Sequence, residues 1–250
     1  MDKKFSQDVT IPCYQTDVNG RLKPAAFMDM MQDMAYLAAT ELGFGYEALQ
    51  THHTAWVLSR MHFTFDNPPS WRDRVHMETW HKGLDGLLFL RDFRLLDDSG
   101  KVRLSCTSSW IVIDVTTRRL VRSDSLGGIV AEDTQCHEDA IATPAPKLAM
   151  PRDAQVEKVS ERKVTFSDVD LNGHVNNVRY VVWATDCLPY ELMEQGRLSD
   201  VVINFNREIL PGETVELYMA TSEQDDRMLY YIEGKVDSRQ AFITELSIRK

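Results

Sequence analysis

Three polar side chains alternate along one short segment: Asp170, Asn172 and His174 occupy every second position. Histidine is the common general acid or base near neutral pH. An asparagine amide can orient a carbonyl group or a water molecule, and an aspartate can fix a neighbouring donor. A helix predicted directly after the segment would add free backbone N–H groups that can stabilise a developing oxyanion. The segment is therefore a candidate catalytic loop.

This candidate loop is the second copy of an internal repeat. Residues 17–27 read DVNGRLKPAAF and residues 170–180 read DLNGHVNNVRY. Both follow D-x-N-G-x-(L/V) and end on an aromatic residue, and they lie 153 positions apart. An extended segment precedes each copy and a helical one follows it, which predicts a duplicated fold.

The two copies differ where it matters for chemistry: Arg21 of the first is replaced by His174 in the second, and Lys23-Pro24 by Asn176-Asn177. Asp, Asn and Gly all favour turn backbone, so Asp170 and Asn172 could simply hold the turn, as their counterparts in the first copy must. His174 could then be a half-buried histidine with satisfied contacts. A duplicated fold with one active half is the favoured interpretation, and both readings of His174 stay open at this point.

Buried helices are expected directly after both copies. Pro24 suits the first turn of a helix, and Gly43 is a plausible stop. In the second copy Asn176 or Asn177 could cap a helix that Pro189 ends or kinks. Both helices are apolar over more than one stripe, which is typical of buried helices.

Each expected helix is followed by four expected strands with turn signals between them. The strands cover residues 56–66, 75–82, 87–97, 102–114, 200–208, 213–221, 227–237 and 240–249. Consecutive strands joined by short turns form an antiparallel sheet, and a helix packed on such a sheet is an α+β arrangement. We therefore expect an α+β protein built from two similar halves.

An acidic, proline-containing segment separates the two halves. Residues 123–157 contain seven acidic and two basic residues, so they carry half of the net charge of −10. We expect an N-terminal domain over residues 1–125, an acidic linker over 126–155 with a short helix near 129–141, and a C-terminal domain over 156–250. A linker of this length is expected to cross from one half to the other.

Composition excludes several classes of function. The net charge of −10 argues against a nucleic-acid-binding protein, and no apolar run approaches the ~18 residues that span a bilayer. The first residues lack the continuous apolar stretch that is typical of a signal peptide, and the four cysteines lack the spacing of zinc or redox motifs. We therefore expect reduced thiols in a cytoplasmic protein. Phosphate-binding, G-x-S-x-G and H-E-x-x-H motifs are absent, and neither a metal nor an organic cofactor is expected.

Residues 168–180, DVDLNGHVNNVRY, resemble the signature of acyl-acyl carrier protein thioesterases. This family of plant plastid and bacterial enzymes releases fatty acids from acyl carrier protein. The first half of the chain resembles the family in several further motifs, which occur in the family's order. These motifs are WVLSRM at 56–61, PSWRD at 69–73, ETW at 78–80, RDF at 91–93 and TRRL at 117–120.

The resemblance implies two fused hotdog domains, each an antiparallel sheet wrapped around a long central helix. It implies catalysis in the C-terminal half, with Asp170, Asn172 and His174 as catalytic loop residues, and acyl-site shaping by the N-terminal half. It also implies that Glu208, in the segment NREI, is a candidate base that activates water. Plant members often carry a cysteine after this glutamate. The chain has Ile209 there, which favours direct attack by water over a thiol acyl-enzyme.

The resemblance further implies hydrolysis of fatty acyl-acyl carrier protein thioesters, which releases free fatty acid and terminates chain elongation. Val175, Asn176 and Asn177 are the expected substrate-binding residues. Acyl carrier protein is the expected partner, and because it is strongly acidic we expect a basic docking patch. The candidates for this patch are Arg118, Arg119 and Arg122, or Lys158, Arg162, Lys163 and Arg179.

Three other functions stay open on the sequence. An acyl-CoA thioesterase would use the same chemistry, and a hotdog hydratase or dehydratase would also use a histidine with a carboxylate. A non-catalytic acyl-thioester binding protein would keep only the pocket. Neither the preferred acyl chain nor association into a homodimer follows from the sequence.

Two structural expectations complete the sequence analysis. Trp71, Trp80 and Trp110 are expected in the core or the sheet. Arg91 and Asp92 are expected to form a structural pair rather than a catalytic one.

Overall fold

The computed structural model describes residues 3–65, 67–122, 134–195 and 198–250. The first half contains β1 (Phe5–Thr10), α1 (Pro24–Glu41), α2 (Tyr46–Thr51), β2 (Thr54–Thr64), β3 (Arg74–Asp85), β4 (Leu88–Asp97), β5 (Val102–Asp114) and β6 (Leu120–Val121). The second half contains β7 (Glu157–Lys163), α3 (Asn177–Asp186), α4 (Tyr190–Gln195), β8 (Leu198–Phe205), β9 (Thr214–Gln224), β10 (Arg227–Val236) and β11 (Arg239–Arg249).

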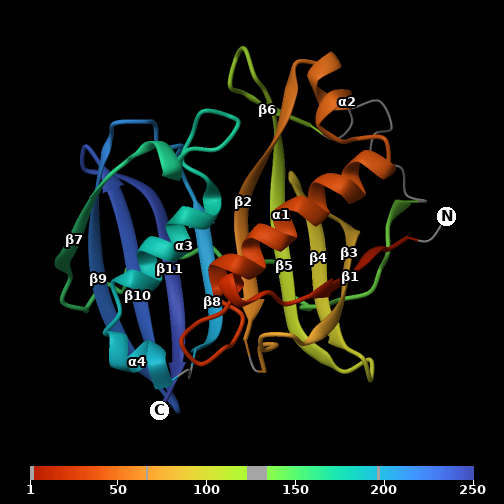
Figure 1. Cartoon of the computed structure of the whole chain (residues 1–250). Coiled ribbons are helices and arrows are strands. Elements are labelled where there is room, and N and C mark those ends of the chain that lie inside the picture. Colours follow the sequence, from red (N-terminus) through yellow and green to blue (C-terminus); the bar gives the residue numbers. More distant parts are fainter. Residues whose placement is uncertain (1–2, 66, 123–133, 196–197) are drawn as a thin grey trace.

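The two halves share one continuous antiparallel sheet (Figure 1). Its strand order is β1-β3-β4-β5-β2 in the first half and, reading inward from the other edge, β7-β9-β10-β11-β8 in the second. The halves meet where β2 pairs with β8, with Met61 opposite Ile203. Helices α1 and α3 lie against the same face of the sheet (Figure 1). The expected α+β class is therefore confirmed.

The internal repeat is confirmed in the backbone, because corresponding features lie 153 residues apart. These features are short 3-10 helices at Cys13–Gln15 and Phe166–Asp168 and the starts of α1 and α3 at Pro24 and Asn177. Gly20 and Gly173 hold the two turns with φ of 72° and 78°. These are left-handed values that a side chain rarely tolerates, so the glycine of the motif is a backbone requirement.

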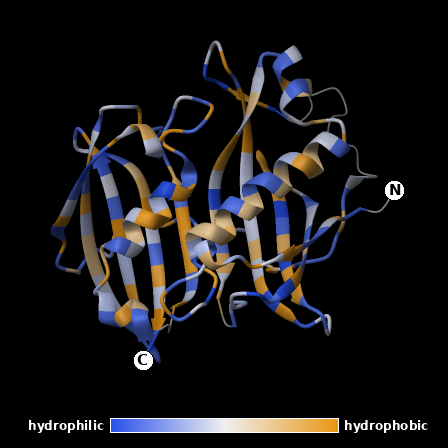
Figure 2. Ribbon diagram, in the orientation of Figure 1, coloured by the Kyte–Doolittle hydropathy of each residue, from blue (hydrophilic) through white to orange (hydrophobic). Residues whose placement is uncertain are grey.

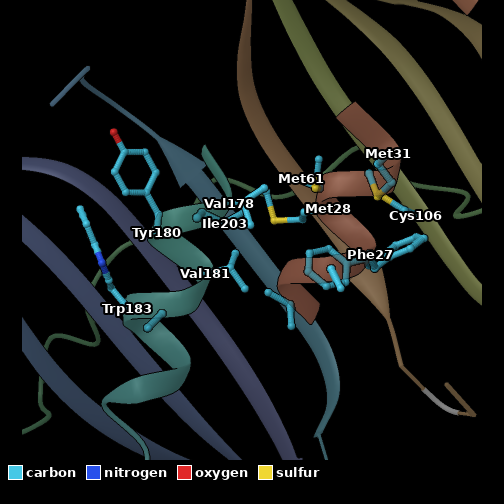
Figure 3. Close-up of a cluster of buried hydrophobic side chains, with 14 of the residues drawn as sticks. Phe27, Met28, Met31, Met61, Cys106, Val178, Tyr180, Val181, Trp183 and Ile203 are labelled. Atoms are coloured by element: carbon cyan, nitrogen blue, oxygen red, sulfur yellow. The ribbon is translucent and has the colours of Figure 1, made fainter. Parts of the chain in front are cut away.

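The core lies between the two helices and the sheet. Figure 3 shows Met28 of α1 and Val178 of α3 in one cluster with Ile203 of β8. Along the strands, apolar residues alternate with polar ones (Figure 2), which is the pattern of a sheet with one face on a core. In the second half the ring of Tyr180 stacks on Phe242, with centroids 4.8 Å apart.

Residues 134–150 cross the sheet face that is turned away from the helices. Three hydrogen bonds attach them to both halves: Glu138 O accepts from Trp80 Nε1, Ala140 N donates to Asp92 Oδ2, and Leu148 N donates to Asn204 Oδ1. The expected crossing of the linker is confirmed for these residues. Residues 134–141 form no α-helix, so the expected helix near 129–141 is wrong for its described part; residues 123–133 and the predicted boundary at 125/126 lie outside the described residues.

Two expectations about side chains are wrong. Arg91 and Asp92 do not pair, because adjacent residues of a strand point to opposite faces of the sheet. Arg91 lies on the helix-facing side, whereas Asp92 lies on the linker side, 3.3 Å from Lys82 Nζ. Trp71 is 49% exposed, since it lies in the turn before β3, whereas Trp80 is buried as expected and Trp110 lies in β5.

A substitution at Gly234 would test how tightly the second half is packed. A Cβ at this position would collide with the ring of Phe242, so we expect Gly234→Ala to lower the unfolding free energy by about 1–3 kcal/mol. The measurement is thermal or urea unfolding, with the exposed Thr221→Ala on the neighbouring β9 as the control, which should change stability little. An unchanged midpoint in Gly234→Ala would show that this packing is loose.

Candidate active site

The carboxylate of Asp170 shapes the loop that carries His174. It accepts a hydrogen bond from Asn172 N at 2.8 Å, while the backbone N of Asp170 donates to His174 O at 2.9 Å. In the first half Asp17 makes the same contact with Asn19 N at 2.8 Å. The structure therefore places Asp170 in a turn-holding position, and the side chain of Asn172 is exposed at the turn.

The carboxylate of Asp168, a residue that was not predicted from the sequence, holds the loop in place. It accepts from Thr165 N and Oγ1 at 2.9 and 2.8 Å and from Arg179 Nε at 2.8 Å. Burial opposes ionisation of this group, but these hydrogen bonds outweigh burial and lower the pKa of Asp168. The spacing of Thr165 and Asp168, three residues apart before a turn, is the signal of a capping box that could have found it.

The three expected substrate-binding residues lie at the start of α3. Asn176 caps the helix, since its Oδ1 accepts from Val178 N at 2.9 Å. The Val175 side chain is buried in the core, and its N–H donates to Ile209 O at 2.9 Å, which ties the loop to the segment of Glu208. Asn177 is the first helical residue. Substrate contact by these residues stays a prediction.

The His174–Glu208 pair is the chemical centre of the site. Strand β8 ends at Phe205, so the expected strand over 200–208 is too long and Glu208 lies in the following loop. His174 Nε2 lies 3.5 Å from Glu208 Oε2, and both side chains are about one third exposed. Catalytic hydrogen bonds are often this long before substrate binds. Because both side chains are partly exposed, water can reach this carboxylate–imidazole pair.

Arg118 completes the site from the first half. It lies in the turn between β5 and β6 with φ of 58°, and its Nη2 contacts the same Oε2 of Glu208 that His174 approaches. The sequence predicted Arg118 only as part of a docking patch. Its contact with Glu208, 90 residues away in the sequence, depends on how the two halves are joined.

The corresponding position in the first half has different chemistry. Arg21 replaces His174 and pairs with Asp17, with Nη2 to Oδ2 at 3.1 Å. Pro68 corresponds to Glu208, because Pro69 O accepts from Leu22 N as Ile209 O accepts from Val175 N. The histidine–glutamate pair therefore occurs in the second half alone.

The described residues contain neither a metal-binding cluster nor a membrane-spanning helix. No group of three or more His, Cys, Asp or Glu side chains within them could hold a metal ion. No helix in the described part of the chain is long and apolar enough to cross a membrane.

Profiles of two protein families match the chain in series. The profile described as acyl-ACP thioesterase N-terminal domain matches residues 2–125, and the one described as acyl-ACP thioesterase C-terminal domain matches residues 152–245. The chain belongs to the acyl-ACP thioesterase family. The family expected from the sequence motifs is therefore confirmed.

Curated relatives agree with this assignment. Oleoyl-acyl carrier protein thioesterase 2, chloroplastic, of Arabidopsis thaliana is 25% identical over 250 residues, covering 92% of this chain and 66% of the relative. Palmitoyl-acyl carrier protein thioesterase, chloroplastic, of Gossypium hirsutum is 28% identical over 215 residues, covering 82% and 52%. The chain thus spans between about half and two thirds of the length of these relatives.

Solved structures show the same fold. An acyl-ACP thioesterase from Bacteroides thetaiotaomicron superposes with a TM-score of 0.88 at 24% identity, covering 100% of this chain and 98% of that one. The 12:0-ACP thioesterase from Umbellularia californica gives a TM-score of 0.83 at 22% identity, covering 100% and 99%. The expected fold of two fused hotdog domains is confirmed.

The role of Asp168 can be tested through pH. Because its pKa is lowered in the folded state, its charge stabilises the fold above the unfolded pKa of about 3.8, and this contribution is lost as the pH falls further. We expect Asp168→Asn to lower the unfolding free energy at pH 7 by about 1–3 kcal/mol, and the difference from wild type to shrink below about pH 4.

The control for Asp168→Asn is Asp186→Asn, which removes an exposed partner of Arg162. An exposed pair of this kind is worth less than about 1 kcal/mol. The measurement is the unfolding midpoint in urea between pH 3 and pH 7. Matching pH profiles for the two variants would contradict the assigned role.

Proposed function

We propose that this protein hydrolyses fatty acyl thioesters of acyl carrier protein to release free fatty acid, which terminates chain elongation. The observation that carries the proposal is the His174–Glu208 pair beside the start of a buried helix, in a chain of the acyl-ACP thioesterase family. The names of the Arabidopsis and Gossypium relatives, both acyl carrier protein thioesterases, support this substrate class.

In the proposed reaction, water is the nucleophile. Glu208 or His174 takes a proton from the water as its oxygen bonds to the thioester carbonyl carbon. The tetrahedral intermediate then collapses, the carbon–sulfur bond breaks, and the proton is returned to the leaving thiolate. The products are a fatty acid and the carrier's free thiol. Ile209 next to Glu208 offers no thiol, which supports direct attack by water.

The remaining loop residues serve orientation and charge in this proposal. The exposed amide of Asn172 orients the substrate carbonyl, and backbone N–H groups at the start of α3 stabilise the developing oxyanion. Asp170 acts through the turn that presents His174. Arg118 contacts the Glu208 carboxylate and holds it in place.

The basic docking patch for the acidic carrier is proposed at Arg118, Arg119 and Arg122. All three side chains are exposed; Arg118 contacts Glu208, and the other two follow it closely in the chain. In the second candidate cluster three of the four charges are already paired: Lys158 with Glu216, Arg162 with Asp186 and Arg179 with Asp168. In the first cluster one of the three is paired among the described residues, Arg118 with Glu208. Paired charges attract an acidic partner less than unpaired ones do. We therefore favour the first cluster.

A cytoplasmic location is also part of the proposal. All four cysteines are free thiols, and two of them, Cys106 and Cys136, are buried. Reduced thiols are typical of proteins in a reducing compartment. Because β2 and β8 already pair the two hotdog halves within one chain, the proposed site does not require a homodimer.

The assignment predicts a large loss of hydrolysis in two variants. We expect His174→Ala and Glu208→Ala each to lower kcat on acyl-acyl carrier protein by about 10²- to 10⁴-fold, because each removes a proton-transfer group. The matched controls are His76→Ala and Glu223→Ala, whose side chains pair with Asp8 and Lys250 at other edges of the fold.

The assay is release of free fatty acid from acyl carrier protein and from CoA thioesters of the same chain. Full activity in both site variants would sink the assignment of roles. Faster turnover of the CoA thioester would replace the proposed substrate by acyl-CoA. Release of a dehydrated acyl thioester instead of fatty acid would point to a dehydratase, and binding without turnover to a non-catalytic acyl-thioester binding protein.

The docking patch predicts a change in KM rather than in kcat. We expect Arg119→Glu and Arg122→Glu to raise the KM for acyl-acyl carrier protein several-fold at low salt, with less effect at high salt, because charge screening weakens steering. Arg162→Glu is the control, since Arg162 is already paired with Asp186. An unchanged KM in both patch variants would remove this surface from the proposal.

A further inference from the structure

Gln32 of α1 reaches from the first half of the chain to the start of α3 in the second half. Its Nε2 donates to Asn176 Oδ1 at 3.4 Å, and both side chains are partly buried. Asn176 is the N-cap of α3, because the same Oδ1 also accepts from Val178 N. A residue of the first half therefore contacts the cap of the helix whose start carries the oxyanion-binding N–H groups in the proposed reaction.

The cap determines which way both side-chain amides point. A backbone N–H can only donate, so Asn176 presents its amide oxygen to Val178, and a partner that approaches this oxygen from α1 must be a donor. Gln32 meets this requirement with its NH₂ group. An ionised glutamate at position 32 would offer acceptors alone, which the same oxygen repels.

The packing of α1 on α3 places Gln32 opposite this cap. On α1, Asp29 lies three residues before Gln32, and on α3, Arg179 lies three residues after Asn176. The charge of Arg179 favours ionisation of Asp29, although burial outweighs it and raises the pKa of Asp29. One turn forward on α1 thus corresponds to one turn back on α3, and apolar side chains of both helices pack in one core cluster (Figure 3).

The duplicated fold contains the corresponding position without this contact. The offset of 153 residues relates Asn176 to Lys23 and Gln32 to Thr185. Lys23, at the N-cap of α1, makes no side-chain cap, and Thr185 Oγ1 donates to carbonyl groups of its own helix. Within the described residues, the hydrogen bond between one helix and the cap of the other therefore occurs only at the helix start that follows His174.

We propose that Gln32 is a positioning residue for the hydrolytic step, acting through the Asn176 side chain on the start of α3. This inference rests on the proposed function. The start of α3 is held from both halves of the chain, by Gln32 and by Asp168 O, which accepts from Asn176 N at 2.8 Å. The N–H groups of the first turn therefore stay aimed at the thioester oxygen as negative charge develops there. Such donors act more strongly on the transition state than on bound substrate, so loosening them lowers kcat more than it raises KM.

The test measures hydrolysis of acyl-acyl carrier protein by the full-length protein. Gln32→Met keeps the length and helix propensity of the side chain but removes its donor. We expect it to lower kcat about 3- to 10-fold, the size of one hydrogen bond, with little change in KM. Gln32→Glu should lower kcat at least as much. The matched control is Asp33→Asn at the next, exposed position of α1, which should leave both constants unchanged.

A double-mutant cycle shows whether Gln32 acts through Asn176. Asn176→Ser keeps a capping hydroxyl for α3, but its side chain is too short to reach Gln32. We therefore expect Gln32→Met to cause no further loss of kcat in the Asn176→Ser background. Full additivity of the two losses would overturn the proposal.

Stability and the wild-type rate separate the remaining outcomes. Because the Gln32 amide is only partly buried, we expect Gln32→Met to unfold close to the wild-type temperature. A loss of kcat accompanied by an equal rise in KM and a large fall in unfolding temperature would make Gln32 a structural residue and overturn its role. A wild type that does not hydrolyse acyl-acyl carrier protein contradicts the proposed function itself. An active wild type with an equally active Gln32→Met contradicts the role of Gln32 alone.

Discussion

The antiparallel pairing of β2 with β8 is the interaction on which the rest of the structure depends. It joins the strands of the two halves into one sheet, and it sets α1 and α3 against the same face (Figure 1). Because of this pairing, the turn after β5 reaches the loop after β8, where Arg118 contacts Glu208. A site formed from both halves of the chain therefore depends on a junction that contains no site residue.

The duplicated turn shows how one backbone can serve two purposes. Asp17 and Asp170 accept the same hydrogen bond from the residue two positions later, and a left-handed glycine follows in both copies. The turn has the same geometry in the copy that contains the candidate catalytic residue His174 and in the copy that does not. What differs is the side chain that it presents: Arg21 is neutralised by Asp17, whereas His174 is directed to a carboxylate on another loop. Of the two copies of the turn, the second therefore presents a histidine to a glutamate and the first does not.

Buried polar groups have different surroundings on the two faces of the first-half sheet. On the outer face, Asp92 is covered by the linker and receives hydrogen-bonding partners from Ala140 and Lys82. On the inner face, the adjacent Arg91 is buried beneath α1 beside a cavity and without such a covering segment. Adjacent positions in one strand therefore have opposite surroundings, which alternation along the strand explains.

Local patterns in the sequence determined the α+β class, the repeat, the helix starts at Pro24 and Asn177 and the loop that carries His174. Turn and helix signals act over a few residues, so they can be read without the fold. Other features were decided only by the tertiary structure: the placement of Glu208 beyond the end of β8, its contact with Arg118, and the separation of Arg91 from Asp92. These depend on strand ends, strand pairing and sheet faces, which bring together residues that are far apart in the chain and separate residues that are neighbours in it.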